Sequence, residues 1–278
     1  MDDYRSVRKS LMDSMDDLSN SEKKVARSLL AQYPAAGLNT VASLAEAAGV
    51  SAPTVVRFVA KLGYAGYPAF QRALIHEVNA EMGSPVRQFS TKAMEPTSGA
   101  LTRTQHAFAD MIELTYDEVP QSEFDRVVEL LSKSAAEVWV VGGRFSRLLA
   151  EYLVLHLRLL RPRVNMTLPD AMGHRTTLAD LTSSSVVVIF DYRRYDESLA
   201  AFAEAAAERG ATVCLMTDNW LSPAAQSAKV VLPCRVESAS PFDSLVAAMA
   251  LTESVITGVT ERLGETGLKR LQDLEGDH

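Results

Sequence analysis

The first eighty residues carry apolar positions at helical spacing, interrupted by short polar segments. Residues 19–22 (SNSE) have the spacing of a capping box, so a helix is expected to begin there and to end before Tyr33-Pro34. Further helices are predicted over residues 40–49, 51–63 and from Pro68 to about Ala80, with glycines closing the first two. This part of the chain is therefore predicted to be all-helical.

Beyond residue 100 the pattern changes to apolar runs typical of β-strands, which alternate with amphipathic helices. Continuous apolar strands between helices indicate a parallel sheet covered on both faces. The predicted strands are residues 137–142, 163–167, 185–190, 212–216 and 230–233, and a long helix is predicted over 242–263. The second region is thus predicted to be an α/β domain with a five-stranded parallel sheet sandwiched by helices.

A segment rich in Gly, Pro, Ser and Thr separates the two patterns. Residues 83–100 (GSPVRQFSTKAMEPTSGA) show no sustained apolar period. We therefore predict a helical domain over residues 1–82, a linker over 83–100 and an α/β domain over 101–278.

Composition and charge narrow the function classes. With 47% hydrophobic and 23% charged residues in 278, the chain is typical of globular proteins, and disordered or collagen-like classes are excluded. The net charge of −7 is uneven, because residues 1–80 hold 9 Lys+Arg against 8 Asp+Glu and the remainder hold 19 against 27. A near-neutral small domain can still bind phosphates if its cations share one face, so a local nucleic-acid site is compatible with this charge.

The cysteines and the length of the apolar runs indicate where the protein is located and whether it binds a metal or cofactor. No apolar run approaches the roughly 18 residues that cross a bilayer, so a cytoplasmic protein without a membrane partner is expected. Cys214 and Cys234 are isolated, and we predict that both are buried thiols. Neither metal-ligand spacing nor a cofactor motif is found, so no metal and no cofactor are predicted.

Residues 41–58 have the pattern of a helix-turn-helix. A small Ala45 lets two helices pack closely, Gly49 supplies the turn, and Val50 and Val55 fill the core between the helices. The second helix begins with small residues that can enter a major groove, so the segment predicts DNA binding.

The predicted DNA contacts lie on and just after this second helix. Arg57 could bond bidentately to guanine or clamp a phosphate, or it could pair with Glu46 instead. Tyr64 and Tyr67 surround a glycine turn, where they could touch backbone phosphates or brace the fourth helix. The complete candidate set is Ser51, Ala52, Pro53, Thr54, Arg57, Lys61, Tyr64 and Tyr67.

Residues 18–30 (LSNSEKKVARSLL) and 44–74 (LAEAAGVSAPTVVRFVAKLGYAGYPAFQRAL) resemble the N-terminal helix-turn-helix domain of the RpiR family of bacterial transcriptional regulators. In members of that family the second half of the chain is a SIS, or sugar isomerase, domain, which matches the five-stranded pattern over residues 105–265. The resemblance implies a sequence-specific regulator of double-stranded operator DNA, controlled by a small anionic metabolite, commonly a phosphosugar.

Two SIS phosphate elements are altered in this chain. Where the family usually presents Gly-x-Gly-x-Ser, residues 142–150 read GGRFSRLLA, so Gly142 and Ser146 match while Gly143 is followed by Arg144 in place of the second glycine. Ser146 could hold a phosphate together with amides at the helix start, or simply cap the helix. A dinucleotide site is the poorer interpretation, since the third glycine of its fingerprint is missing.

The family's second element, a Ser-x-Ser-Gly-x-Thr loop, is replaced by residues 190–198 (FDYRRYDES). Arg193 and Arg194 there follow a parallel strand, and their guanidinium forks suit phosphate or carboxylate. Alternatively they pair with neighbouring acids or with a partner subunit. Before the last helix, Ser240 and Ser244 are candidate hydroxyl donors or helix caps.

The SIS fold also serves sugar-phosphate isomerases, which need a positioned acid or base. The five histidines are scattered, and only His174 lies near the expected cleft rim. We therefore predict a regulator rather than an enzyme, with a sugar-phosphate isomerase or sugar-phosphate-binding protein as the alternative. A homodimer or tetramer is expected, because a two-fold protein reads a two-fold operator.

Overall fold

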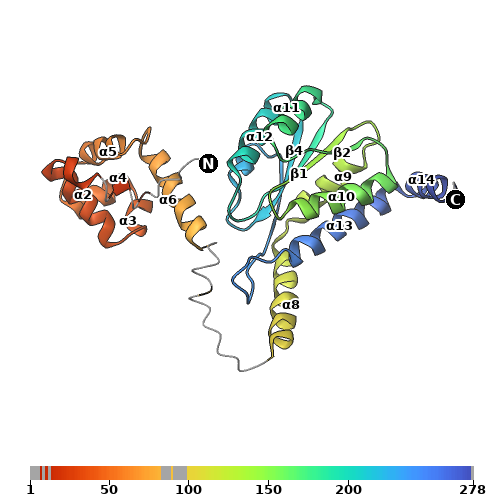
Figure 1. Cartoon of the computed structure of the whole chain (residues 1–278), viewed down its shortest axis with the longest axis horizontal. Helices are drawn as coiled ribbons and strands as arrows, with labels where there is room; N and C mark the ends of the chain where they lie inside the picture. The colour runs from red at the N-terminus through yellow and green to blue at the C-terminus, as the bar shows by residue number, and fades with distance from the viewer. Residues whose placement is uncertain (1–6, 8–9, 12–13, 83–88, 90–98, 277–278) are drawn as a thin grey trace. The chain divides into compact units, whose positions relative to one another are not determined.

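The computed structural model describes residues 7, 10–11, 14–82, 89 and 99–276, and the chain divides into two compact units, residues 1–84 and 85–278 (Figure 1). The predicted linker, 83–100, lies outside the described residues except for Phe89, Gly99 and Ala100.

The first unit is all-helical, as predicted. Its elements are η1 (Met15–Asp17), α2 (Asn20–Ala31), α3 (Ala35–Leu38), α4 (Val41–Ala48), α5 (Ala52–Lys61) and α6 (Tyr67–Met82). The capping box at the start of α2 is present, with the Glu22 carboxylate accepting the Ser19 N–H at 2.8 Å. Gly49 adopts a φ of 62°, the left-handed conformation that turns the chain from α4 into α5. The one-turn helix α3 was not predicted.

The core of this unit lies between α2, α4, α5 and α6. Leu29, Leu44, Val55, Phe58 and Phe70 are each at most 1% exposed. The helix-turn-helix pair therefore rests on a continuous apolar core, which fixes the direction in which α5 presents its outer face.

The second unit contains the predicted parallel sheet. Its strands are β1 (Val138–Gly142), β2 (Val164–Met166), β3 (Val186–Phe190), β4 (Thr212–Asp218) and β5 (Val230–Cys234), in the order β2-β1-β3-β4-β5 with every neighbouring pair parallel. Cys214 and Cys234 are free and buried, as expected.

Helices cover both faces of this sheet (Figure 1). One face packs mainly against α9 (Gln121–Ser132), α10 (Arg147–Leu160) and α13 (Val246–Leu263), joined by α8 (Ala100–Glu118) and α14 (Glu265–Glu275). The other face packs against α11 (Ala171–Asp180), α12 (Glu197–Glu208) and the short η2 (Pro223–Gln226). Within the described residues, no helix is long and apolar enough to span a bilayer.

The strand order reverses between β1 and β3. The chain leaves β1 for β2 on one side and returns to β3 on the other, and Gly142 pairs with Phe190 where both strands end. Ligands of open α/β sheets bind outside the carboxyl ends of the strands at such a reversal. A ligand site is therefore expected at the loops 143–146 and 191–196.

Candidate functional site

The first turn of α5 presents small, exposed side chains. Ser51, Ala52 and Pro53 are exposed, and the Ser51 hydroxyl lies 2.9 Å from that of Thr54 rather than bonding to a helix amide. A helix end of this shape brings its backbone close to whatever it contacts, as the recognition helix of a helix-turn-helix requires.

Arg57 lies one turn further along α5. Its side chain is exposed, and among the described residues it has no ion pair, including none with Glu46. The guanidinium is thus available to an external acceptor.

Lys61, the second cation among the predicted DNA contacts, has internal partners. Its Nζ donates to the Asp17 carbonyl at 2.6 Å and to the Glu22 carboxylate at 3.2 Å. Together with the bonds from Ser19, which are the larger cause, this contact holds the pKa of Glu22 below its usual value. These contacts favour a role in joining α5 to α2 over a DNA contact.

The two tyrosines after α5 differ in exposure. Tyr67 is buried, and its hydroxyl donates to the carbonyls of Gly37 and Asn39, both at 3.1 Å. Tyr64 is half-buried and stands edge-on to Phe70, with ring centroids 5.5 Å apart. Burial raises the pKa of both phenols. The geometry favours the bracing role for Tyr67, while Tyr64 keeps part of its surface open.

Ser146, proposed as a phosphate ligand, is buried and hydrogen-bonded. Its hydroxyl accepts from the Gly143 N–H at 2.9 Å and donates to the Phe190 carbonyl at 2.7 Å. Its side chain does not cap α10. A Cβ added at Gly142 would lie 2.7 Å from the Arg147 nitrogen, so helix and strand approach too closely for any other residue. The favoured role of Ser146 is to fasten the β1 loop to β3.

Arg144, which replaces the family's second glycine, lies outside this packing. Its side chain is exposed, with Cζ 5.4 Å from the centroid of the Phe145 ring, and that ring is itself 63% exposed. The position leaves Arg144 at the rim of the β1 loop.

The two arginines of the β3 loop occupy different environments. The Arg193 side chain is only 6% exposed, lies 4.1 Å above the Trp220 ring and pairs with Asp243, whose Oδ1 is 3.2 Å from Nη2. Its Nε is buried without a hydrogen-bond partner in the described part of the chain. Arg194 is exposed and has a φ of 72°, uncommon for a residue other than glycine. The pairing of Arg193 is with Asp243, not with the neighbouring acids that the sequence suggested.

Two buried carboxylates tie the β3 loop to the β4 loop. Asp218 accepts from the Arg193 N–H and the Tyr195 hydroxyl, both at 2.6 Å. Asp191 in turn accepts a short hydrogen bond from the Ser222 hydroxyl. Burial raises the pKa of both carboxyls, that of Asp191 to about 7. Their partners lie far along the chain, and the sequence offered no periodic signal for them.

The remaining candidates stabilise turns or the interior. Ser240 accepts from the Phe242 N–H at 3.1 Å, and Ser244 accepts from the Val246 N–H at 3.2 Å at the start of α13. His174 is buried, with its ring centroid 4.7 Å from that of Phe202, and burial lowers its pKa.

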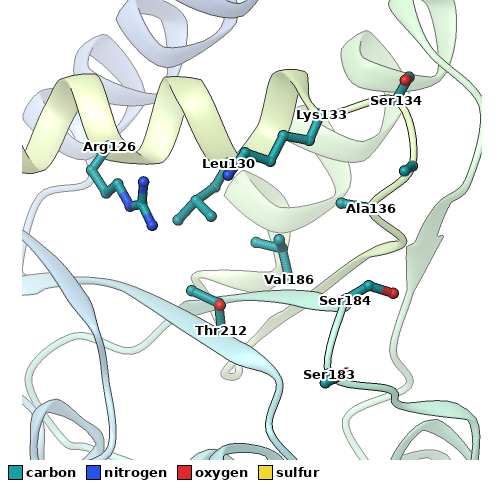
Figure 2. A pocket seen from close by; sticks show the side chains of 10 residues that line it. Arg126, Leu130, Lys133, Ser134, Ala136, Ser183, Ser184, Val186 and Thr212 are labelled. Carbon is teal, nitrogen blue, oxygen red and sulfur yellow. The ribbon is translucent and has the colours of Figure 1, made fainter.

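A cavity of about 430 Å³ opens at the opposite edge of the sheet, where the strands begin (Figure 2). Arg126 of α9 and Lys133, the residue that follows this helix, line it with Ser183, Ser184 and other residues, none of which is a predicted ligand residue. Both cations pair with Glu129, at 2.6 and 3.0 Å, so their charge is already partly compensated.

Comparison with known proteins follows this division of the chain. Residues 6–81 match the helix-turn-helix domain of the rpiR family, and residues 130–258 match the SIS domain. The transcriptional regulator HexR of Pseudomonas aeruginosa is 25% identical over 280 residues, covering 97% of this chain and 95% of that protein. HexR of Escherichia coli is 24% identical over 279 residues, with coverage of 95% and 92%.

Solved structures share the fold. NanR of Vibrio vulnificus, complexed with ManNAc-6P, aligns with a TM-score of 0.62 at 19% identity, over 97% of this chain and 96% of that one. The sugar isomerase domain of an RpiR transcription factor from Sphaerobacter thermophilus aligns with a TM-score of 0.61 at 23% identity, over 64% and 99%. With its helix-turn-helix unit followed by a SIS unit, the chain belongs to the RpiR family of transcriptional regulators.

Proposed function

We propose that the protein binds a specific operator through α5 and that a small anionic metabolite, of the phosphate-ester class, controls this binding. The observation that carries the DNA site is the outer face of α5, where Arg57, which has no ion pair with any described residue, follows a first turn of small exposed residues. In this position Arg57 reaches a guanine edge or a phosphate, while Ser51 and Thr54 offer hydroxyls.

The effector site is placed at the carboxyl ends of β1 and β3. Arg193 supports it, because its buried guanidinium, whose Nε has no partner among the described residues, is suited to bind an anion at the strand ends where open sheets take ligands. NanR, which has the same fold, is solved with a phosphosugar. The sugar phosphate would approach past the exposed Arg144 and reach Arg193 with its phosphate.

We also propose that the second unit forms a homodimer through α10. Leu148, Leu155 and Leu159 are 64%, 62% and 46% exposed, and their spacing places them on one helix face. Such a stripe of leucines is unusual on a solvent-facing helix and is suited to a second copy. Sedimentation at several concentrations tests this, since Leu155→Glu should yield monomers. A Leu155→Glu variant that sediments like the wild type would place the interface elsewhere.

The alternative is a sugar-phosphate isomerase, because the SIS fold is shared with a protein described as a putative sugar-phosphate isomerase from Listeria monocytogenes (TM-score 0.55, 18% identity). His174, the histidine that the sequence places near the strand ends, is buried against Phe202 and is therefore poorly placed to act as an acid or base. Incubation of the full chain with common sugar phosphates decides between the two, since turnover would favour the enzyme.

Selection of sheared genomic DNA on the purified protein tests the DNA site. We expect enrichment of a palindromic sequence by the wild type and its loss in Arg57→Ala. Arg27→Ala is the matched control, because Arg27 is an exposed arginine on α2 and its removal changes the charge equally. Equal enrichment by the wild type and Arg57→Ala would remove Arg57 from the site.

The effector site has a separate test. Metabolite extracts fractionated for phosphate esters should alter operator affinity of the wild type, and combined replacement of Arg193 and Arg194 by Gln should abolish the response. An intact response in a folded double variant would move the anion site away from the β3 loop.

A further inference from the structure

The loop between β5 and α13, residues 235–245, makes two ion pairs with described residues outside the loop, besides the pair between its own Arg235 and Glu237. Asp243, near its end, pairs with Arg193 at the candidate anion site. Arg235, at its start, pairs with Glu118 in the last turn of α8. The loop thus links the candidate anion site at Arg193 to α8, the helix that follows the predicted linker.

Asp243 contacts only one of the two nitrogens on one edge of the Arg193 guanidinium. Oδ1 lies 3.2 Å from Nη2 of Arg193, whereas Nε, on the same edge of the guanidinium, has no hydrogen-bond partner within the described residues. An unpaired donor on a buried cation is costly, and a bidentate acceptor on this edge would satisfy it. A phosphate monoester carries about −1.5 to −2 charge at pH 7 and three acceptor oxygens, so it can occupy both nitrogens where this carboxylate occupies one.

The Arg235 contact is bidentate and is joined by a second contact with α8. The guanidinium binds both carboxylate oxygens of Glu118, with Nε 2.9 Å from Oε2, and this contact raises the pKa of Arg235. The Arg235 N–H also donates to the Thr115 hydroxyl at 3.0 Å. Two side chains of the last turn of α8 are therefore fastened to the first residue of the loop.

A single backbone hydrogen bond joins the two ends of the loop. The Ser244 N–H donates to the Val236 carbonyl at 2.8 Å. Ser244 follows Asp243 directly, and Val236 follows Arg235. This bond gives a path from Asp243 to Arg235 that is shorter than the loop itself.

We propose that loop 235–245 is an internal latch in which Asp243 occupies the place of the effector's phosphate. An arriving phosphate ester displaces the carboxylate from Arg193, the loop shifts, and the Arg235–Glu118 pair passes the shift to α8. This inference rests on the proposed effector site and names how that site is regulated. A ligand can shift the equilibrium only by its different affinity for the two states, which here is the competition with Asp243.

Calorimetric titration of the full chain with inorganic phosphate and glucose 6-phosphate tests the competition, with glucose as the uncharged control. Asp243→Asn should bind both phosphates more tightly than the wild type, by about 5- to 150-fold, the range of ordinary coupling energies. Asp180→Asn, which removes an exposed carboxylate of α11, should bind like the wild type. Asp243→Ser serves as a second variant, and tryptophan emission of each variant verifies folding. Equal affinities in the wild type and both Asp243 variants would overturn the latch.

The transmission step has its own variant. Glu118→Gln should keep the phosphate affinity of the wild type but lose the effect of glucose 6-phosphate on operator affinity. A Glu118→Gln protein that responds fully would overturn transmission through Arg235. Absence of operator binding by the wild type would instead defeat the proposed function itself, so the two failures are distinguishable.

Discussion

Replacement of Ser146 by Ala separates a structural from a ligand role for the residue that best matches the family's phosphate motif. The hydroxyl makes one accepted and one donated hydrogen bond in a buried setting. A buried group left without its partner costs about 1–3 kcal/mol. The Phe190 carbonyl still accepts from the Gly143 N–H at 3.2 Å, so both groups keep one partner. We therefore expect a loss of about 1–2 kcal/mol, in the lower part of that range.

Urea unfolding followed by tryptophan fluorescence measures this loss selectively. The chain has two tryptophans, Trp139 and Trp220, and both belong to the second unit. Ser146→Ala should lower the unfolding midpoint and leave phosphate affinity unchanged. Ser198→Ala, at an exposed position of α12, is the control and should stay within about 0.5 kcal/mol of the wild type. Unchanged stability combined with lost phosphate binding would refute the structural role of Ser146.

Three further outcomes are expected. Gly142→Ala should lower the free energy of unfolding of the second unit by about 1–3 kcal/mol through overpacking. Gly143→Ala, whose Cβ would meet nothing nearer than 3.5 Å, should be nearly neutral. Equal urea midpoints for the two variants would contradict this. Tyr67→Phe, which removes a buried hydroxyl donor, should lower stability of the first unit by about 0.5–1.5 kcal/mol while operator affinity is kept, as circular dichroism and anisotropy would measure. Burial raises the pKa of Asp191 to about 7, so between about pH 4 and 7 the folded state binds more protons than the unfolded state. The free energy of unfolding should therefore fall as the pH rises from about 4 to 7. Asp191→Asn should flatten this dependence of stability on pH, followed by tryptophan fluorescence.

The elements that the sequence predicted are those with a local signal. The five strands follow from continuous apolar runs, and their observed ends differ from the predicted ones by at most two residues. The helix-turn-helix follows from the small Ala45 and from the turn residue Gly49, which has the left-handed conformation. In these places the period of the side chains and the turn chemistry agree with the final packing.

The elements that sequence reasoning missed depend on partners distant in the chain. The helix α14 packs on α10 and α13, and it was not predicted from its own sequence. Likewise, nothing near Arg193 in sequence indicates that Asp243 and Trp220 will meet its guanidinium. Neighbouring acids were the obvious partners, yet Asp191 turns toward Ser222 instead. Side-chain pairing at strand ends is set by sheet order, which periodicity alone does not fix.

The most direct test of the account is the affinity of the selected operator for the wild type and Arg57→Ala, measured by fluorescence anisotropy at about 50 and 200 mM salt. The account predicts that the wild type prefers the operator over a scrambled duplex by at least about 10³-fold. Arg57→Ala should lose about 1–3 kcal/mol on the operator, roughly 5- to 150-fold, and much less on the scrambled duplex. Equal affinity of the wild type for both duplexes, or an unchanged affinity in the variant, would contradict sequence reading through α5.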